Sequence, residues 1–177
     1  MTEASPQRTF RLTLEYDGSS FSGWQRQKDQ VTVQGVLEQA LTTILDQPVT
    51  VSGSGRTDAG VHALGQVASF TARTRLDGQT LRKGLNSLMR EPVVVLECDT
   101  ASPDFHAQYS AVSKTYQYRL LNQPIPCAVG RQYVWHLRNP LDIDVMNQCC
   151  RILVGTHDFK SFENTGSPRR STVRQIF

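Results

Sequence analysis

The stretch V-T-V-S-G-S-G-R-T-D-A-G-V-H-A, Val49 to Ala63, is the feature around which the rest of the chain is organised. A strand-like run, Val49 to Ser52, leads into a glycine-rich loop that carries a single carboxylate, Asp58. Small residues around that carboxylate let the backbone bend and let a ligand approach closely. A cation, Arg56, and an imidazole, His62, lie nearby in the sequence. These residues alone fit two interpretations equally: a ligand-binding loop built around one acid, or an ordinary glycine-rich turn capped by an Asp.

The hydrophobic pattern on both sides of this loop alternates between a period of two, typical of half-buried strands, and helical spacing. Thr32 is a favourable N-cap for the first helix, and Pro48 ends it. The predicted elements are a strand at Arg8–Tyr16, a helix between Thr32 and Pro48, strands at Val49–Ser52 and Val67–Ala72, a helix at Leu76–Met89 and a strand at Val93–Cys98. The order β-α-β-β-α-β is that of a ferredoxin-like α+β domain, an antiparallel four-stranded sheet with two helices on one face.

In that arrangement the glycine-rich loop joins the second and third strands. The helix-free face of the sheet is open and can present side chains to a single-stranded partner, as the sheet of RNA-recognition domains does. RNA is therefore a candidate partner by fold analogy. Trp24, beside Arg26 in a polar loop, has two interpretations: an exposed ring that stacks on a base, or a ring that covers the edge of the sheet.

The second half of the chain predicts further elements of the same kind. A new strand begins at Lys114, with Tyr116 on one of its faces. A helix follows at Leu141–Val154, with Asp142 as its N-cap, and Thr172–Phe177 has the pattern of a strand. The helix residues predicted to face inward are Met146, Cys149, Cys150 and Leu153.

Composition narrows the class of protein. The 177 residues include 19 Lys and Arg against 16 Asp and Glu, and the net charge of +3 permits a polyanionic partner without requiring one. No apolar run approaches the roughly 18 residues of a membrane span, and the start M-T-E-A-S-P-Q-R lacks the apolar core of a signal peptide. We therefore expect a soluble cytoplasmic protein that does not enter a membrane. The four cysteines form no C-x-x-C pair, and no His spacing completes a zinc site, so we expect no metal.

Six short motifs follow one another along the chain. They are E-Y-D-G at 15–18, G-W-Q-R-Q at 23–27, G-R-T-D-A-G-V-H-A at 55–63, F-H-A at 105–107, K-T-Y-Q-Y at 114–118 and G-T-H-D-F at 155–159. In this order and spacing they closely resemble the tRNA pseudouridine synthase A family. The resemblance runs from about Phe10 to the last residue, and the glycine-rich motif is its most specific part.

The resemblance implies an isomerase that converts uridines on the 3′ side of the tRNA anticodon loop and in the adjoining stem to pseudouridine, without a cofactor. It implies a homodimer in which the tRNA contacts both subunits. Each subunit would join two ferredoxin-like domains around a central cleft, here residues 8–101 with the catalytic loop and residues 102–177. The family continues for a further stretch that completes the second sheet and supplies a basic partner for the catalytic aspartate. We therefore expect the second domain to be truncated and this chain alone to have little or no activity.

By the same resemblance Asp58 is the nucleophile, Tyr116 the active-site tyrosine and Arg56 the arginine of the catalytic loop. The carboxylate can attack C1′ of the sugar or C6 of the base, or assist formation of a glycal, and the sequence does not choose among these routes. Arg56 can favour the ionised form of Asp58, contact a phosphate or fill the space left by a flipped nucleotide. Tyr116 can stack on uracil or be a core tyrosine of its strand. We interpret His62 and His106 as structural, hydrogen-bonded histidines.

Two other functions compete with the isomerase. The first is a non-catalytic RNA-binding module that uses basic loops with Arg26, Lys28, Arg73 and Arg75. The second is a carboxylate-dependent nucleosidase that releases free base. Replacement of Asp58 by Asn separates the first from an enzyme, and an assay for free uracil identifies the second.

Overall fold

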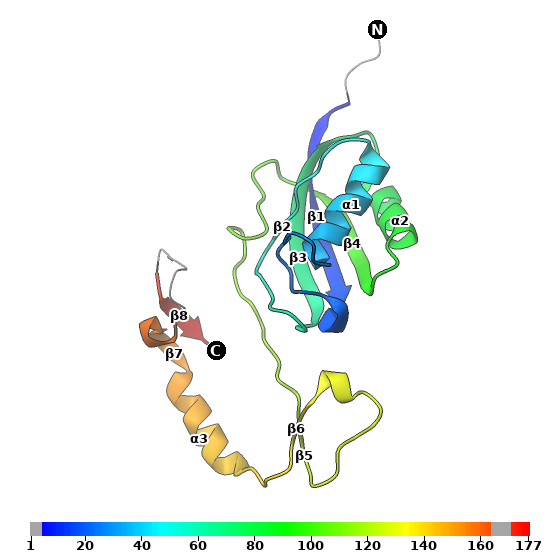
Figure 1. Cartoon of the computed structure of the whole chain (residues 1–177). Helices are drawn as coiled ribbons and strands as arrows, with labels where there is room; N and C mark the ends of the chain where they lie inside the picture. Colours follow the sequence, from blue (N-terminus) through cyan, green and yellow to red (C-terminus); the bar gives the residue numbers. More distant parts are fainter. Residues whose placement is uncertain (1–4, 164–170) are drawn as a thin grey trace. The chain divides into compact units, whose positions relative to one another are not determined.

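The computed structural model describes residues 5–163 and 171–177. It contains two compact units, Met1–Tyr116 and Gln117–Phe177 (Figure 1). Within the described residues, three α-helices and mainly antiparallel strands make up an α+β fold, as the sequence predicts. None of those helices has the length and apolar character needed to cross a membrane.

The first unit is a four-stranded antiparallel sheet with two helices. Its elements are β1 (Gln7–Tyr16), the 3-10 turn η1 (Gly18–Ser20), α1 (Val33–Leu45), β2 (Ser52–Gly53), β3 (Ala63–Arg73), α2 (Gly78–Leu88) and β4 (Val93–Ala101). The strands are arranged in the order β2-β3-β1-β4. This is the predicted sequence of strands and helices, and β1 pairs with both β3 and β4 at the centre of the sheet.

The core of this unit lies between the sheet and its helices. Alternate residues of β1, including Phe10 and Leu12, are completely buried in one cluster with Leu37 of α1 and Leu85 of α2. Because the same strand face contacts both helices, α1 and α2 cover one side of the sheet. Both helices begin at side-chain caps: Gly35 N–H donates to Thr32 Oγ1 at 3.2 Å, and Thr80 N–H donates to Asp77 Oδ1 at 2.7 Å.

The strand β2 is shorter than predicted. Only Ser52 and Gly53 pair with β3, so the predicted strand Val49–Ser52 is wrong at its N-terminal side. The reason is that Val51 forms its hydrogen bonds with α1: its N–H donates to Glu38 Oε1 at 3.0 Å, and its C=O accepts from Gln34 Nε2 at 3.0 Å. Side chains of a helix thus replace the strand ladder at this point.

The helix-free face of the sheet differs from that of an RNA-recognition sheet. Arg11 on β1 pairs with Asp99 on β4 at 3.0 Å, and Thr13 donates to Glu97 Oε2 at 3.0 Å. The segment that follows β4 covers another part of this face, where Ala107 N–H donates to Ser69 Oγ at 3.0 Å. The exposed part of this face therefore carries mixed charge and hydroxyls, with no aromatic ring on the strand positions that face it. This surface does not support the stacking expected from the fold analogy.

The second unit consists of smaller pieces. Its elements are β5 (Leu120–Asn122), the 3-10 turn η2 (Arg131–Tyr133), β6 (Trp135–Leu137), α3 (Ile143–Leu153), β7 (Gly155–Asp158), the 3-10 turn η3 (Lys160–Phe162) and β8 (Val173–Ile176). Strands β5 and β6 form a short parallel pair, and β7 and β8 form an antiparallel pair. The strand predicted to begin at Lys114 begins only at Leu120, because none of the described strands forms a ladder with the residues before it.

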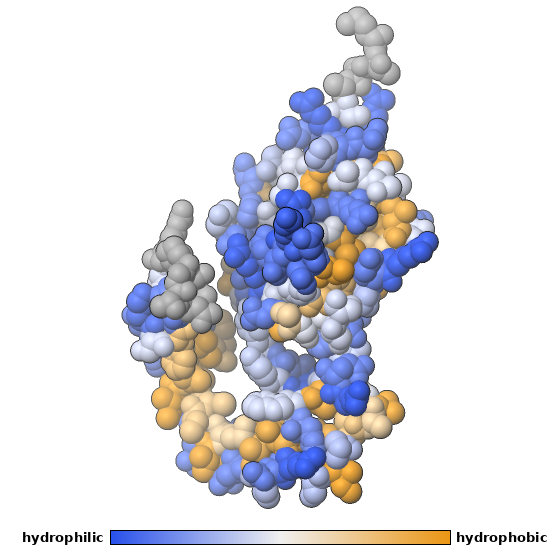
Figure 2. All heavy atoms as spheres, viewed as in Figure 1, coloured by the Kyte–Doolittle hydropathy of each residue, from blue (hydrophilic) through white to orange (hydrophobic). Residues whose placement is uncertain are grey.

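The helix α3 has the predicted cap, since Val145 N–H donates to Asp142 Oδ1 at 2.9 Å, but it is shorter than the predicted Leu141–Val154 because it begins only after this cap and ends at Leu153. The prediction that its apolar stripe is buried is wrong for the described residues. Cys149 and Cys150 are exposed, as are the other members of that stripe, Met146 and Leu153. Apolar side chains are visible along α3 in Figure 2. The described part of its unit contains only two-stranded ladders, which offer no sheet wide enough to cover a helix.

Candidate active site

The glycine-rich loop connects β2 to β3 and can be followed in Figure 1. Asp58 and Arg56 are both exposed on it. The ion pairs found among the described residues do not include one between them, so a direct pairing of Arg56 with Asp58, one of the three roles considered for Arg56, is not observed. The loop therefore presents a carboxylate and a guanidinium to solvent as separate groups.

Thr57, between these two residues, faces the protein and anchors the loop. Its hydroxyl lies 2.9 Å from the hydroxyl of Tyr16, at the end of β1, and either oxygen can donate the hydrogen bond. Its backbone C=O accepts a hydrogen bond from Trp24 N–H, also at 2.9 Å. The residue before Asp58 is thus held by both its side chain and its main chain.

The motif E-Y-D-G supports the far end of the same loop. A Cβ on Gly18 would lie 2.1 Å from the backbone oxygen of Val61, so only glycine allows this close approach. His62 Nδ1 lies 3.0 Å from Asp17 Oδ1 and 3.1 Å from the backbone nitrogen of Gly18. His62 is therefore a hydrogen-bonded loop histidine, as predicted, and it joins the end of the loop to the end of β1.

The motif G-W-Q-R-Q supports the loop from the other side. Gly23 has a φ of +92°, and a Cβ there would lie 2.6 Å from the backbone oxygen of Thr57. Trp24 is only 2% exposed and belongs to the core cluster, with its indole against the backbone of Gly53. The structural interpretation of Trp24 is therefore correct, and its ring is not available to stack on a base.

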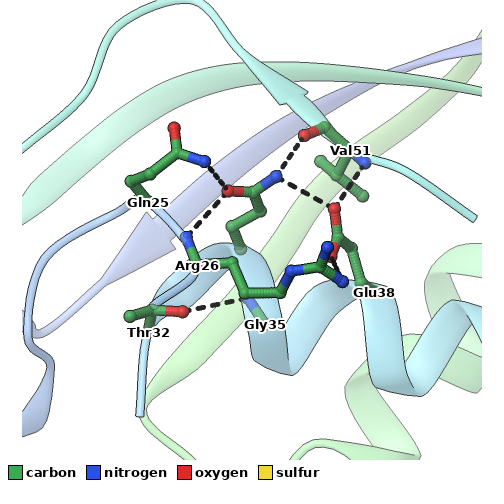
Figure 3. A network of polar contacts seen from close by, with 7 residues as sticks. Gln25, Arg26, Thr32, Gly35, Glu38 and Val51 are labelled. Carbon is green, nitrogen blue, oxygen red and sulfur yellow. Dashed lines mark hydrogen bonds and ion pairs between the residues drawn. The ribbon is translucent and has the colours of Figure 1, made fainter. Parts of the chain in front are cut away.

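A polar network fastens this motif to α1 (Figure 3). Gln34 accepts hydrogen bonds from Gln25 Nε2 and from Arg26 N–H, each at 2.9 Å, and donates to Glu38 Oε1 at 2.9 Å. The other oxygen of Glu38 lies 3.2 Å from Arg26 Nη1. Because Glu38 is buried, Arg26 supplies the positive charge that its carboxylate needs. Arg26 has a structural role in addition to any contact with RNA.

The backbone of the same motif caps α1. Val33 N–H donates to the C=O of Gly23 at 3.2 Å, and Gln34 N–H donates to the C=O of Trp24 at 3.1 Å. These are helix N–H groups that have no partner within the helix. The start of α1, the G-W-Q-R-Q loop and Thr57 therefore form one connected support.

The residues 114–116 pass close to this loop. The Lys114 amino group lies 3.0 Å from the position that a Cβ of Gly55 would occupy. Burial has the largest effect on the pKa of the Tyr16 phenol and raises it. The hydrogen bond with Thr57 lowers this pKa by a smaller amount, and the electrostatic interaction with Tyr116 raises it slightly. The Tyr116 side chain is 71% exposed, so among the described residues it is not a core tyrosine.

Several supporting residues were not identified from the sequence. Thr57 and Tyr16 carry no motif signal that connects them, because their contact spans 41 positions. Gln34 and Glu38 were recognisable in principle, since two polar residues at i and i+4 lie among buried apolar residues of α1.

His106 is structural, as predicted: its ring stacks on Tyr109 with centroids 4.4 Å apart.

The arrangement provides an exposed carboxylate on an anchored loop, with a guanidinium on the same loop and an aromatic ring on the neighbouring segment. Such a set is suited to attack on, or proton transfer with, a nucleotide whose base stacks on the ring. In residues 5–163 and 171–177 no three His, Cys, Asp or Glu side chains are grouped in a way that would bind a metal ion.

Comparison with known proteins gives consistent results. The sequence profile of a family described as tRNA pseudouridine synthase matches residues 13–110. The tRNA pseudouridine synthase A of Thermoanaerobacter sp. (strain X514) is 41% identical over 170 residues, which cover 96% of this chain and 70% of that protein. The tRNA pseudouridine synthase A 2 of Clostridium tetani is 39% identical over 171 residues, covering 96% and 69%. The tRNA pseudouridine synthase A of Methylacidiphilum infernorum is 44% identical over 170 residues, covering 94% and 66%.

Proposed function

The chain belongs to the tRNA pseudouridine synthase family of isomerases that act on tRNA, and on that premise we propose that Asp58 is the nucleophile that converts uridine to pseudouridine. The observation that carries the proposal is the position of this carboxylate. It is exposed on a loop that two other motifs hold in place, through the contacts of Tyr16 and Trp24 with Thr57, while Asp58 stays accessible. The proposed substrates are uridines on the 3′ side of the tRNA anticodon loop and in the adjoining stem.

The reaction is an isomerisation and needs no cofactor. The C1′–N1 bond breaks with its electron pair on the uracil, the base turns, and a C5–C1′ bond forms. The proton on C5 is lost and N1 gains one, so atoms and electrons balance without an oxidant or reductant. A single carboxylate can act as nucleophile at C1′ or C6, or as the base that removes a sugar proton on a glycal route. All three routes use Asp58 in its ionised form.

Arg56 and Tyr116 complete the proposed site. The guanidinium of Arg56 is exposed and not paired with Asp58, which favours the two roles that involve RNA: contact with a phosphate, or occupation of the space left by a flipped nucleotide. The exposed ring of Tyr116 offers a surface on which uracil can stack. The amino group of Lys114, two residues earlier, lies 3.0 Å from the position that a Cβ of Gly55 would occupy, which supports a location beside the catalytic loop.

The proposal extends to the architecture of the enzyme. Residues 8–101 form a ferredoxin-like domain with the catalytic loop, and residues 102–177 contribute to a second domain of the same type. The sheet order β2-β3-β1-β4 and the β-α-β-β-α-β sequence of elements support this plan for the first domain. The enzyme acts as a homodimer that binds one tRNA across both subunits, in the cytoplasm.

The test compares the protein, in a chain extended to the length of its relatives, with its Asp58→Asn variant. Wild-type protein and tRNA are incubated, and the digested tRNA is analysed for pseudouridine and for free uracil. We expect the variant to form no pseudouridine while it retains affinity for tRNA in a filter-binding assay. An active variant would refute the role of Asp58. A wild-type protein that binds tRNA without changing it would indicate a binding module, and one that releases uracil would indicate a nucleosidase.

A further inference from the structure

The contact between Tyr16 and Thr57 joins the central strand of the sheet to the residue that precedes Asp58. Tyr16 is the last residue of β1, is 3% exposed and belongs to the core cluster. Its ring packs 6.3 Å from that of Trp24, which is itself buried. The phenol oxygen therefore has a fixed position, and Thr57 is the hydrogen-bond partner that the structure gives it.

The two anchors of Thr57 come from different elements. Tyr16 binds its side chain from β1, and Trp24 binds its backbone oxygen from the loop that caps α1. With both contacts formed, rotation of the chain about Thr57 is restricted. The next residue is Asp58, whose carboxylate makes no ion pair among the described residues and which is exposed. The main chain therefore sets the direction of the Cα–Cβ bond of Asp58, on which the position of its carboxylate depends.

We propose that the Tyr16–Thr57 hydroxyl pair is a positioning device for catalysis, which fixes the direction in which Asp58 meets the target nucleotide. This inference rests on the proposed role of Asp58. Because the Tyr16 side chain is buried and the Thr57 hydroxyl is turned towards it, the proposed action of both residues is through the backbone of the loop. Small displacements of a reacting group are costly: an error of about 1 Å reduces a rate on the order of a hundredfold. Loss of one of two anchors should have a smaller effect of the same kind.

The phenol is suited to this task because it stays protonated. Burial is the main cause of its raised pKa, so the O–H is retained at neutral pH and the hydroxyl pair persists through the pH range of an ordinary assay. The carboxylate of Asp58 can then change its interactions during the reaction while the hydroxyl pair remains intact.

A structural role alone would give a different result from a positioning role. Tyr16→Phe keeps the ring in the core and removes only the hydroxyl, and Thr57→Val keeps the shape of the side chain. We expect each variant to lower kcat about tenfold with the KM for tRNA unchanged, because one anchor of the loop is lost while the RNA-binding surface is not. Thr57→Ser retains the hydroxyl and should keep the wild-type kcat.

The double variant provides the sharpest measurement. If the two hydroxyls act as one unit, Tyr16→Phe with Thr57→Val lowers kcat about tenfold, as each single change does, and not about a hundredfold. The matched control is Thr71→Val, which removes a hydroxyl pair of the same kind from the opposite face of the same sheet, where Thr9 Oγ1 and Thr71 Oγ1 lie 3.0 Å apart. It should change the melting temperature without changing kcat.

The outcomes separate the two proposals. Single variants with wild-type kcat, effects that multiply, or a Thr57→Ser enzyme as slow as Thr57→Val would each overturn the positioning role. A Thr71→Val enzyme with an equally reduced kcat would also overturn it, because general destabilisation would then explain the loss. If Asp58→Asn is inactive and Tyr16→Phe is fully active, only the positioning role fails. If Asp58→Asn is active, the proposed nucleophile fails and the positioning role fails with it.

Discussion

The helices α1 and α3 have similar amphipathic patterns but different surroundings. On α1 the apolar stripe is buried, and Leu37 is 0% exposed against the four-stranded sheet. On α3 the corresponding stripe is exposed, with Leu153 at 46%, and Ile152 next to it is 73% exposed, in a unit whose described strands form only pairs. Both helices begin at a side-chain cap in the predicted place. The difference shows that caps and periodicity determine where a helix forms, whereas burial of its stripe depends on a layer supplied by other parts of the chain.

A matched pair of core variants measures this difference directly. Leu37→Ala in α1 should lower the free energy of unfolding by about 3 kcal/mol, because a fully buried leucine leaves a cavity. Ile152→Ala in α3 should cost less than about 0.5 kcal/mol, because its side chain is already largely in water. Urea unfolding of both variants is the measurement. A large cost for Ile152→Ala in the full-length protein would show that another part of the assembly covers α3.

Two glycines of the first unit give the next largest effect. A Cβ on Gly18 would lie 2.1 Å from a backbone oxygen, whereas a Cβ on Gly65 would have nothing within 4 Å. We expect Gly18→Ala to cost about 2 kcal/mol of stability, because the end of the catalytic loop must shift to relieve the overlap. Synthase activity should fall as well. Gly65→Ala should leave both properties nearly unchanged, and equal effects of the two substitutions would contradict the role given to Gly18.

The fold of the first unit was largely predictable because its signals are local. Thr32 marks the start of α1, and alternation along β1 indicates which residues are buried. The errors occur where residues distant in the sequence determine the hydrogen bonding of a segment. Val51 was predicted in a strand, but it bonds to two side chains of α1. Lys114 was predicted to begin a strand, but the described residues supply no neighbouring strand there.

The candidate site shows the same limit. The sequence predicts that Asp58 lies on a flexible, glycine-rich loop, because the eleven residues from Gly53 to Ala63 contain several small residues and a single acidic one. It does not show that Thr57 is the anchored residue, since the contacts of Thr57 come from Tyr16 and Trp24. It also suggested that Arg26 is a free basic residue, although a buried carboxylate on α1 uses its charge. Chemistry-bearing residues were therefore easier to predict than the residues that hold them.

The pairing of Arg26 with Glu38 gives a smaller effect on stability. Arg26 is 70% exposed, so the ion pair itself contributes little, but the buried Oε2 atom of Glu38 already accepts no hydrogen bond among the described residues, and removal of Arg26 takes away its ion-pair partner as well. Arg26→Ala should therefore cost about 1 kcal/mol, and Lys28→Ala in the same loop should cost almost nothing. Addition of Glu38→Gln to Arg26→Ala should recover part of the loss, because the uncompensated charge is removed. A double variant less stable than Arg26→Ala would contradict this account.

The reactivity of the cysteine thiols compares the two units in the protein without any substitution. Burial, with the charge of Asp99, raises the pKa of the Cys98 thiol in β4 to about 12, whereas Cys149 and Cys150 on α3 are exposed. Because the thiolate is the reactive form, iodoacetamide at pH 8 should modify Cys149 and Cys150 quickly and leave Cys98 unmodified, as peptide mass spectrometry can measure. In urea all three should react at similar rates. Because the raised pKa means that the folded state retains the Cys98 proton, stability should fall only as the pH rises above the ordinary thiol pKa towards 12. Rapid modification of native Cys98 would show that the core of the first unit opens more readily than its packing implies, and slow modification of both cysteines on α3 would show that its apolar stripe is covered.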